Sequence, residues 1–193
     1  MTRRWFLLLL CYLLAPASLL CAEQTTRAPI LLVAAPELED PNFSQSVVLV
    51  LFPAHGGPVG VILNKPSELT VKEAFPEDKL LRARADKVFF GGPVRMDVLS
   101  YLVRSAKPPK EGYKVLDNVY LTQDASFLDA LLAKYGKVER YFLGTTGWIA
   151  SQLDAEIEAQ QWFVLPADLD AILHMPPEHM WRNLLARARA VET

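Results

Sequence analysis

The chain has 193 residues, of which 51% are hydrophobic and 22% are charged, and its formal net charge is −2. This length and apolar fraction support one full-sized globular core and exclude a disordered or low-complexity protein. The mildly acidic balance makes nucleic acid an unfavoured partner, because binding a phosphate backbone requires a basic face.

The first 22 residues have the order of a secretory signal peptide. Two arginines are followed by an apolar run from Trp5 to Leu14 and then by small residues up to Ala22. The run is well short of the roughly 20 residues that span a bilayer. We therefore expect cleavage after Ala22, export to the periplasm and an exposed lead-in over residues 23–29. Contact with a membrane is expected only if the peptide remains uncleaved.

Cleavage would remove both cysteines, Cys11 and Cys21, from the mature chain. Lys and Arg would fall from 20 to 18 while the 22 acidic residues stay, so the net charge would become −4. His174 and His179 are separated by two prolines, which exclude the helical i, i+4 spacing of a zinc-binding histidine pair. We expect neither a bound metal nor a cofactor.

The order of apolar runs and turn signals predicts seven or eight strands with four short helices. Strands are expected at 30–35, 46–52, 58–64, 88–94, 98–103, 115–122, 140–144 and 162–165. The four helices are expected at 124–136, after Ser151, at 167–173 and at 177–190, and residues 70–75 have short helical character. The continuous apolar run 46–52 indicates a strand covered on both faces, and the loop 53–57 predicts a hairpin. Since strands and helices do not alternate strictly, we expect an α+β domain with a mixed, largely antiparallel sheet.

The helix over 124–136 has the clearest end signals in the sequence. Asp124 is a natural N-cap, and Gly136 is placed as the residue that ends the helix. Ser151 is the expected N-cap of the later helix. In that helix Glu156 is expected to point away from Asp154 and Glu158, which share a solvated face.

The stretch "GTTGWIASQLDAEIEAQQW" (144–162) combines a glycine turn with this later helix. Trp148 and Trp162, at its two ends, are expected to pack as core or rim aromatics. The turn is one of three polar turns next to apolar strands, the others being 39–46 and 91–94. We expect the three turns to meet and form a groove, because binding residues concentrate on loops that a rigid scaffold holds.

The groove hypothesis names seven candidate binding residues and no catalytic residue. They are Asp40, Asn42, Asn64, Gly91, Gly92, Trp148 and Gln152. A structural alternative is that Asp40 and Asn42 stabilise a turn around Pro41 and that Asn64 ends a strand. The sequence has neither a Gly-x-Ser-x-Gly nucleophile elbow nor a phosphate-binding P-loop.

Several stretches together resemble the YqgE/AlgH family of uncharacterised bacterial proteins. They are "LLVAAPELEDPNFSQSVVLVL" (31–51), "GVILNKP" (60–66), "FGGPV" (90–94), "LTQD" (121–124) and "GTTGWIASQLDAEIEAQQWFVLPAD" (144–168). The resemblance implies one domain over 30–193 with a strongly bent, barrel-like mixed sheet flanked by short helices. It does not imply an activity.

We expect a non-enzymatic binding or regulatory interaction module of the cell envelope, whose protein or small-molecule partner the sequence does not identify. One alternative is an enzyme that uses the polar groups of the groove, with Ser44 beside Asp40, Asn42, Asn64 and Gln152. The other is a transcriptional regulator, which the family name suggests.

Overall fold

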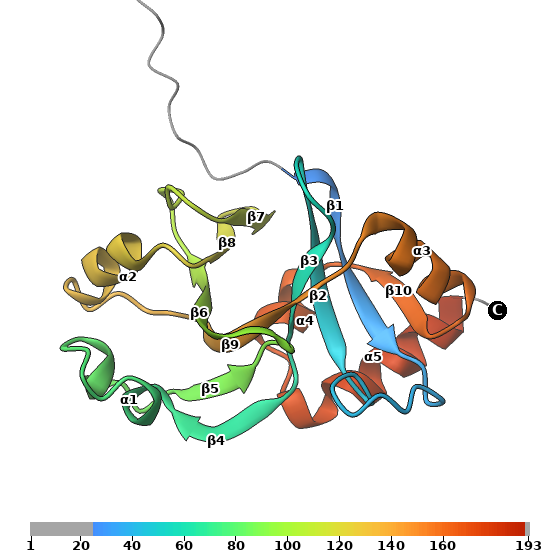
Figure 1. Cartoon of the computed structure of the whole chain (residues 1–193), viewed down its shortest axis with the longest axis horizontal. Helices are drawn as coiled ribbons and strands as arrows, with labels where there is room; N and C mark the ends of the chain where they lie inside the picture. Colours follow the sequence, from blue (N-terminus) through green and yellow to red (C-terminus); the bar gives the residue numbers. More distant parts are fainter. Residues whose placement is uncertain (1–24, 192–193) are drawn as a thin grey trace, which may run out of the picture.

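The structure of the protein, a computed structural model, describes residues 25–191, which form ten strands and five α-helices (Figure 1). The strands are β1 (Thr25–Ala34), β2 (Val47–Pro53), β3 (Val59–Ile62), β4 (Pro66–Thr70), β5 (Lys87–Phe90), β6 (Val94–Arg104), β7 (Tyr113–Leu116), β8 (Val119–Thr122), β9 (Arg140–Gly147) and β10 (Trp162–Pro166). The helices are α1 (Val71–Ala74), α2 (Ala125–Leu132), α3 (Ala150–Glu158), α4 (Leu169–Leu173) and α5 (Pro177–Val191), with a 3-10 turn at Leu81–Ala83. The predicted signal peptide lies outside the described residues.

The strands form one mixed, largely antiparallel sheet, as the sequence predicts. Its order is β10-β1-β2-β3-β9-β6-β8-β7, while β4 pairs with β5 and β5 pairs with β9. Only the β5–β9 pairing is parallel among those in residues 25–191. The sheet is strongly bent and is not closed, since β10 and β7 lie at its two ends. The predicted hairpin between β2 and β3 is present.

Strand β9 belongs to both halves of the bent sheet (Figure 1). Residues 140–143 pair with β6, and 141–143 also pair with β5. Thr145 still pairs with Val94 of β6, whereas Thr146 and Gly147 pair with β3. Gly144 lies between the two parts with φ +76°, a conformation that side chains other than glycine rarely adopt. The change of partners along β9 therefore occurs within two residues of a glycine whose backbone can turn.

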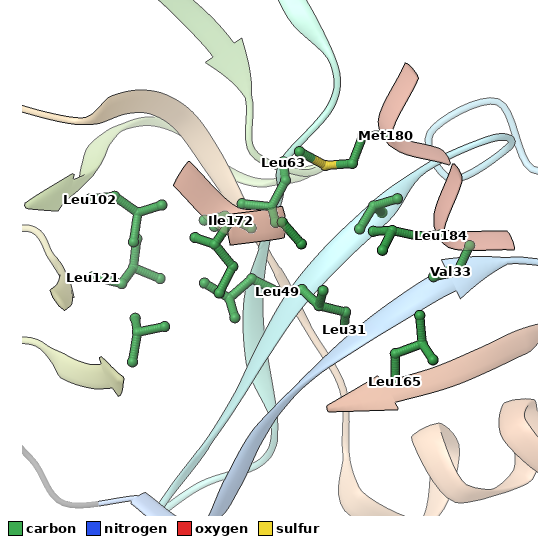
Figure 2. Packing of buried hydrophobic residues seen from close by; sticks show 14 of the residues in the cluster. Leu31, Val33, Leu49, Leu63, Leu102, Leu121, Leu165, Ile172, Met180 and Leu184 are labelled. Atoms are coloured by element: carbon green, nitrogen blue, oxygen red, sulfur yellow. The ribbon is translucent and has the colours of Figure 1, made fainter. Parts of the chain in front are cut away.

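The half built from β1, β2, β3 and β10 is covered on both faces. Alternate residues of β1 and β2 contribute to two separate core clusters, as the continuous apolar run 46–52 predicts. One cluster packs against α4 and α5 and includes Leu31, Leu49, Ile172 and Leu184 (Figure 2). The other packs against α3 and includes Trp148 and Trp162, which are 7% and 5% exposed. The expectation that both tryptophans pack as core or rim aromatics is met.

The other half of the sheet has its own core cluster beside α1 and α2. Tyr101 and Tyr141, each 1% exposed, are its largest fully buried side chains. The Tyr101 hydroxyl donates to the backbone carbonyl of Asp124 at 2.8 Å, whereas the Tyr141 hydroxyl has no hydrogen-bond partner among the described residues.

None of the helices in residues 25–191 has the length and the apolar composition of a membrane-spanning helix.

Several predicted boundaries differ from the structure. Residues 25–29, expected as a lead-in, form the first part of β1, since Thr25 and Arg27 pair with β2. The segment 115–122 is divided between β7 and β8, because the chain turns at Asp117, whose φ is +43°. Strand β4 is absent from the prediction because its sequence PSELT is polar, and it pairs with β5 alone.

Helix ends were only partly predicted. Asp124 caps α2 as expected, accepting a hydrogen bond from the Phe127 amide. The helix ends at Leu132, however, and the left-handed residue that follows is Tyr135, with φ +56°, so the expected role of Gly136 is wrong. The N-cap of α3 is Ile149 and not Ser151, because the first helical amides already bond to the Ile149 carbonyl.

Candidate functional site

A hollow between the strands, here called the main cavity, has a volume of about 520 Å³. It opens where the two halves of the sheet diverge, between β3, β6, β8, the end of β9 and the loop that enters β7. Its polar lining comprises Arg95, Ser100, Lys110, Glu111, Thr122, Gln123, Thr145 and Thr146. Thr145 and Thr146 belong to the predicted glycine turn, whereas the other six residues were not predicted, because they come from segments far apart in the sequence.

The hydroxyl groups that line the main cavity differ in their hydrogen bonds. Ser100 accepts a hydrogen bond from Gln123 Nε2 at 2.9 Å, and Thr122 donates to the carbonyl of Glu111. Thr146 is 1% exposed, and its hydroxyl has no hydrogen-bond partner among the described residues. A buried hydroxyl without a partner costs free energy, so such a group needs an explanation.

The charge in the main cavity is mainly positive. Arg95 and Lys110 are exposed, and neither side chain makes an ion pair or hydrogen bond within residues 25–191. Glu111 is the only carboxylate among the lining residues. Arg95 lies in a register irregularity of β6 and has φ +49°, a backbone conformation that is uncommon for a side chain of this size. Two unpaired cations therefore face a cavity that also offers hydroxyl and amide groups.

A second hollow of about 230 Å³, here called the aromatic hollow, lies next to the main cavity. Its lining includes residues of all three predicted turns, namely Asp40 and Phe43, Pro93 and Val94, and Gly147 and Trp148. Gln152 and Glu156 of α3 complete one wall, and Trp162 of β10 lies behind them. The structure thus brings the three turns together, although the binding role of their residues stays a prediction.

Three aromatic rings pack against one another in the wall of the aromatic hollow. The ring centroids of Phe43 and Trp162 are 5.7 Å apart at 79°, and those of Trp148 and Trp162 are 6.4 Å apart at 84°. Phe43 and Trp148 lie 6.3 Å apart at 35°. The two edge-on contacts of Trp162 have the arrangement that aromatic pairs favour, so they stabilise this wall of the hollow.

Glu156 joins the two tryptophans at this wall. Its Oε2 atom accepts hydrogen bonds from Trp148 Nε1 and Trp162 Nε1, both at 2.9 Å, and its Oε1 atom accepts one from Gln152 Nε2 at 2.8 Å. The sequence analysis correctly predicts that Glu156 points away from Asp154 and Glu158, but it assigns no structural or binding role to Glu156. The signal that was available is its i, i+4 spacing from Gln152, next to the buried residue Leu153.

The remaining polar candidates have structural roles in the turn before β2. Asp40 Oδ1 accepts from the amides of Asn42 and Phe43 at 2.8 and 3.2 Å, which is the turn expected as the alternative. Asn64 accepts from the Val47 amide at 2.8 Å and donates to the Gln45 carbonyl at 2.9 Å. Asn42 and Asn64 line neither the main cavity nor the aromatic hollow.

Lys65, which follows β3 in the chain, also stabilises this turn. Lys65 Nζ donates to the carbonyls of Asn42 and Pro41 at 2.8 and 3.3 Å. Partial burial lowers the pKa of Lys65, and the nearby charge of Asp40 opposes that effect. Asn64 and Lys65 line a third hollow, of about 390 Å³, between this turn and the start of α5.

Gly91 and Gly92 are buried and line neither of the first two hollows. A Cβ atom on Gly91 would lie 2.2 Å from the carbonyl oxygen of Gly144, and one on Gly92 would lie 2.3 Å from that of Thr145. Gly92 also has φ +145°. These glycines let the backbone approach β9 closely, which places the neighbouring Pro93 and Val94 beside the hollows.

No group of three His, Cys, Asp or Glu side chains within residues 25–191 is arranged to hold a metal ion. The side chains that remain for binding are the cations, hydroxyls and amides of the main cavity and the carboxylates and rings of the aromatic hollow.

Comparison with known proteins gives consistent matches along the described chain. A family model described as AlgH-like (DUF179) matches residues 31–191. A UPF0301 protein of Thermobifida fusca is 40% identical over 167 residues, covering 81% of this chain and 84% of the relative. A UPF0301 protein of Thioalkalivibrio sulfidiphilus is 35% identical over 160 residues, covering 81% and 86%.

Two solved structures are also similar. The solution structure of the AlgH protein from Pseudomonas aeruginosa superimposes with a TM-score of 0.66 at 28% identity, covering 91% of this chain and 90% of that protein. The crystal structure of a protein from Corynebacterium diphtheriae gives a TM-score of 0.63 at 26% identity, covering 86% and 89%. These likenesses cover both halves of the sheet and the segments that form the two hollows.

Proposed function

We propose that this chain, which belongs to the AlgH-like family, is a non-enzymatic binding module of the cell envelope that takes a small ligand with an anionic group in its main cavity. The observation that carries the proposal is the pair of cations, Arg95 and Lys110, which line the cavity without an ion-pair partner in the described chain. A bound carboxylate or phosphate would supply the missing counter-charge. Hydrogen bonds between charged partners contribute about 1.5–3 kcal/mol each.

The size and lining of the main cavity support a small ligand. Its volume of about 520 Å³ falls within the roughly 300–1,000 Å³ of typical ligand pockets. Hydroxyls on the firmly paired strands β6, β8 and β9, and the amide of Gln123 directly after β8, offer donors and acceptors. No histidine is among the residues that line it, and Ser100 receives a hydrogen bond from an amide and not from a base. These features suit recognition better than nucleophilic catalysis.

The envelope location rests on the order of residues 1–22, with two arginines, an apolar run and small residues. In that compartment the mature chain would start near Glu23 and would contain no cysteine. Cell fractionation followed by N-terminal sequencing tests this location. Recovery of a protein that begins at Met1 from the soluble cytoplasmic fraction would contradict it.

Binding is tested by titrating the purified mature chain with sodium phosphate and, separately, with succinate, followed by ¹H–¹⁵N NMR. We expect amide shifts at Gly112, Thr145 and Thr146, and Kd values about tenfold higher in Arg95→Gln and Lys110→Gln. Lys107→Gln is the matched control, since Lys107 is an exposed cation of the same loop that does not line the cavity. Shifts located elsewhere, or an equal loss in Lys107→Gln, would refute the proposal.

A further inference from the structure

The main cavity and the aromatic hollow share two lining residues, Val94 and Gly147. Both are exposed, and Val94 is 45% exposed, so they form a low ridge between the hollows that solvent reaches. A ligand lying across this ridge would contact both hollows at once. The valine would offer it an apolar contact between two polar ends.

The two hollows have opposite charge. The main cavity has Arg95 and Lys110 against one carboxylate, whereas the aromatic hollow has Asp40 and Glu156 and no cationic side chain among its lining residues. Lys65, whose pKa the nearby charge of Asp40 raises against the effect of burial, directs its ammonium to the carbonyls of Pro41 and Asn42 and not to the Asp40 carboxylate. Glu156 accepts three hydrogen bonds from uncharged donors, so its negative charge has no counter-ion within the described chain.

The aromatic hollow also has the wall that ammonium groups favour. Phe43, Trp148 and Trp162 line it beside the two carboxylates. An ammonium near aromatic rings gains roughly 0.5–2 kcal/mol from the ring quadrupole, and a carboxylate adds a charged hydrogen bond. The indole N–H groups are occupied by Glu156, which fixes the rings for such a contact.

From this charge pattern we infer that the ligand is a short peptide with free ends, whose carboxylate lies in the main cavity and whose ammonium lies in the aromatic hollow. The inference rests on the proposed function for the anionic end of the ligand. In a single α-amino acid the ammonium and the carboxylate are attached to the same carbon, so the two groups are too close together to lie in two separate hollows. A peptide separates them, and its backbone amides match the polar groups of Thr145 and Gln152 on the two sides of the ridge.

The test uses alanine peptides of two to four residues, measured by isothermal titration calorimetry on the purified mature chain. Each peptide is offered with free ends, with an acetylated N-terminus and with an amidated C-terminus. For the best length, we expect acetylation and amidation each to raise the Kd about tenfold or more. Free alanine should bind at least tenfold more weakly than that peptide.

Variants assign each end of the peptide to its hollow. Glu156→Gln should weaken the free peptide about tenfold and leave the acetylated peptide unchanged, whereas Arg95→Gln should weaken both. Asp154→Asn is the matched control, because Asp154 is exposed on the same helix and does not line the hollow. Asp40→Asn gives a second removal of charge, since an asparagine can still accept the hydrogen bonds of its turn.

The outcomes separate the inference from the proposed function. If acetylation and Glu156→Gln have no effect while amidation and Arg95→Gln weaken binding, the inference is overturned and the proposed function stands. If amidation and Arg95→Gln have no effect, the anionic site itself is wrong. If no peptide binds at millimolar concentration, the peptide is excluded, and the phosphate and succinate titrations decide the proposed function alone.

Discussion

Replacement of Glu156 by alanine should cost about 2–4 kcal/mol of unfolding free energy. The carboxylate is the acceptor for the indole N–H groups of Trp148 and Trp162, whose side chains are 7% and 5% exposed. A buried donor that loses its partner costs about 1–3 kcal/mol. The two donors share one oxygen and Glu156 itself is half-buried, so their costs do not add fully and water can satisfy part of the demand.

Glu156→Gln separates the hydrogen bonds from the charge. Its amide oxygen can take the position of Oε2 and accept from both indoles, while Gln152 rotates its own amide to face the new NH₂ group with its oxygen. We therefore expect a loss below about 1 kcal/mol. Asp154→Ala serves as the surface control on the same helix and should stay within about 0.5 kcal/mol of the unmodified chain.

The assay is urea unfolding of the chain from residue 23 onward at pH 7, followed by tryptophan fluorescence and by far-UV circular dichroism. The deciding quantity is the difference in unfolding free energy between Glu156→Ala and Glu156→Gln. If the two variants lose the same amount, the charge and not the acceptor stabilises the wall. If Glu156→Ala stays as stable as Asp154→Ala, water replaces the carboxylate as the acceptor for both indoles, and the predicted cost of removing Glu156 is wrong. If Glu156→Ala does not fold, the comparison of Glu156→Gln with the unmodified chain still tests whether the loss in Glu156→Gln is below about 1 kcal/mol.

Two further predictions concern buried hydroxyls. Thr146→Val should leave the unfolding free energy unchanged or raise it by up to about 1–3 kcal/mol, since the hydroxyl has no partner to lose; a clear loss in urea unfolding would show that an internal hydrogen bond exists. Burial raises the pKa of Tyr101 and Tyr141, so above about pH 10 the unfolded chain releases protons that the folded chain retains, and stability falls as pH rises. Burial lowers the pKa of Arg140 to about 10 and also lowers the pKa of Lys65, and both of these shifts have the opposite sign, so they oppose the contribution of the two tyrosines. In thermal unfolding from pH 8 to 11, the slope of stability against pH should be less negative in Tyr141→Phe than in the unmodified chain; an equal slope in that variant would contradict the assignment.

The sheet could be predicted from the sequence where burial alone determines a strand. The run 46–52 is apolar at every position because β2 is covered by helices on both faces, so its pattern carries the information. The polar strand β4 has no such pattern, since it pairs only with β5. The break between β7 and β8 was signalled by Asp117, a residue type that tolerates positive φ, but the apolar residues around it favoured one continuous strand.

The candidate site was predictable to a smaller extent. The three turns could be expected to meet, because each adjoins an apolar strand of one sheet. The cations of the main cavity could not, since Arg95 and Lys110 have the local sequence of ordinary surface residues and become part of one wall only through the pairing of β6 with β8 and β9. Asp40 and Asn64 illustrate the reverse case, in which a side chain that suggests binding instead satisfies backbone groups.

The bend in β9 and the presence of two hollows have the same physical origin. Gly144 turns the strand between its two sets of partners, and the three residues that follow it, Thr145, Thr146 and Gly147, line the hollows. The walls therefore come from both halves of the sheet, with β3 and α3 on one side and β6 and β8 on the other. A ligand that spans the ridge would contact both halves only in the folded chain, so at a concentration of 100 Kd it would add about 2.7 kcal/mol to the free energy of unfolding. Since the backbone turn creates the ridge, binding across it would stabilise the part of the fold where the sheet is least regular.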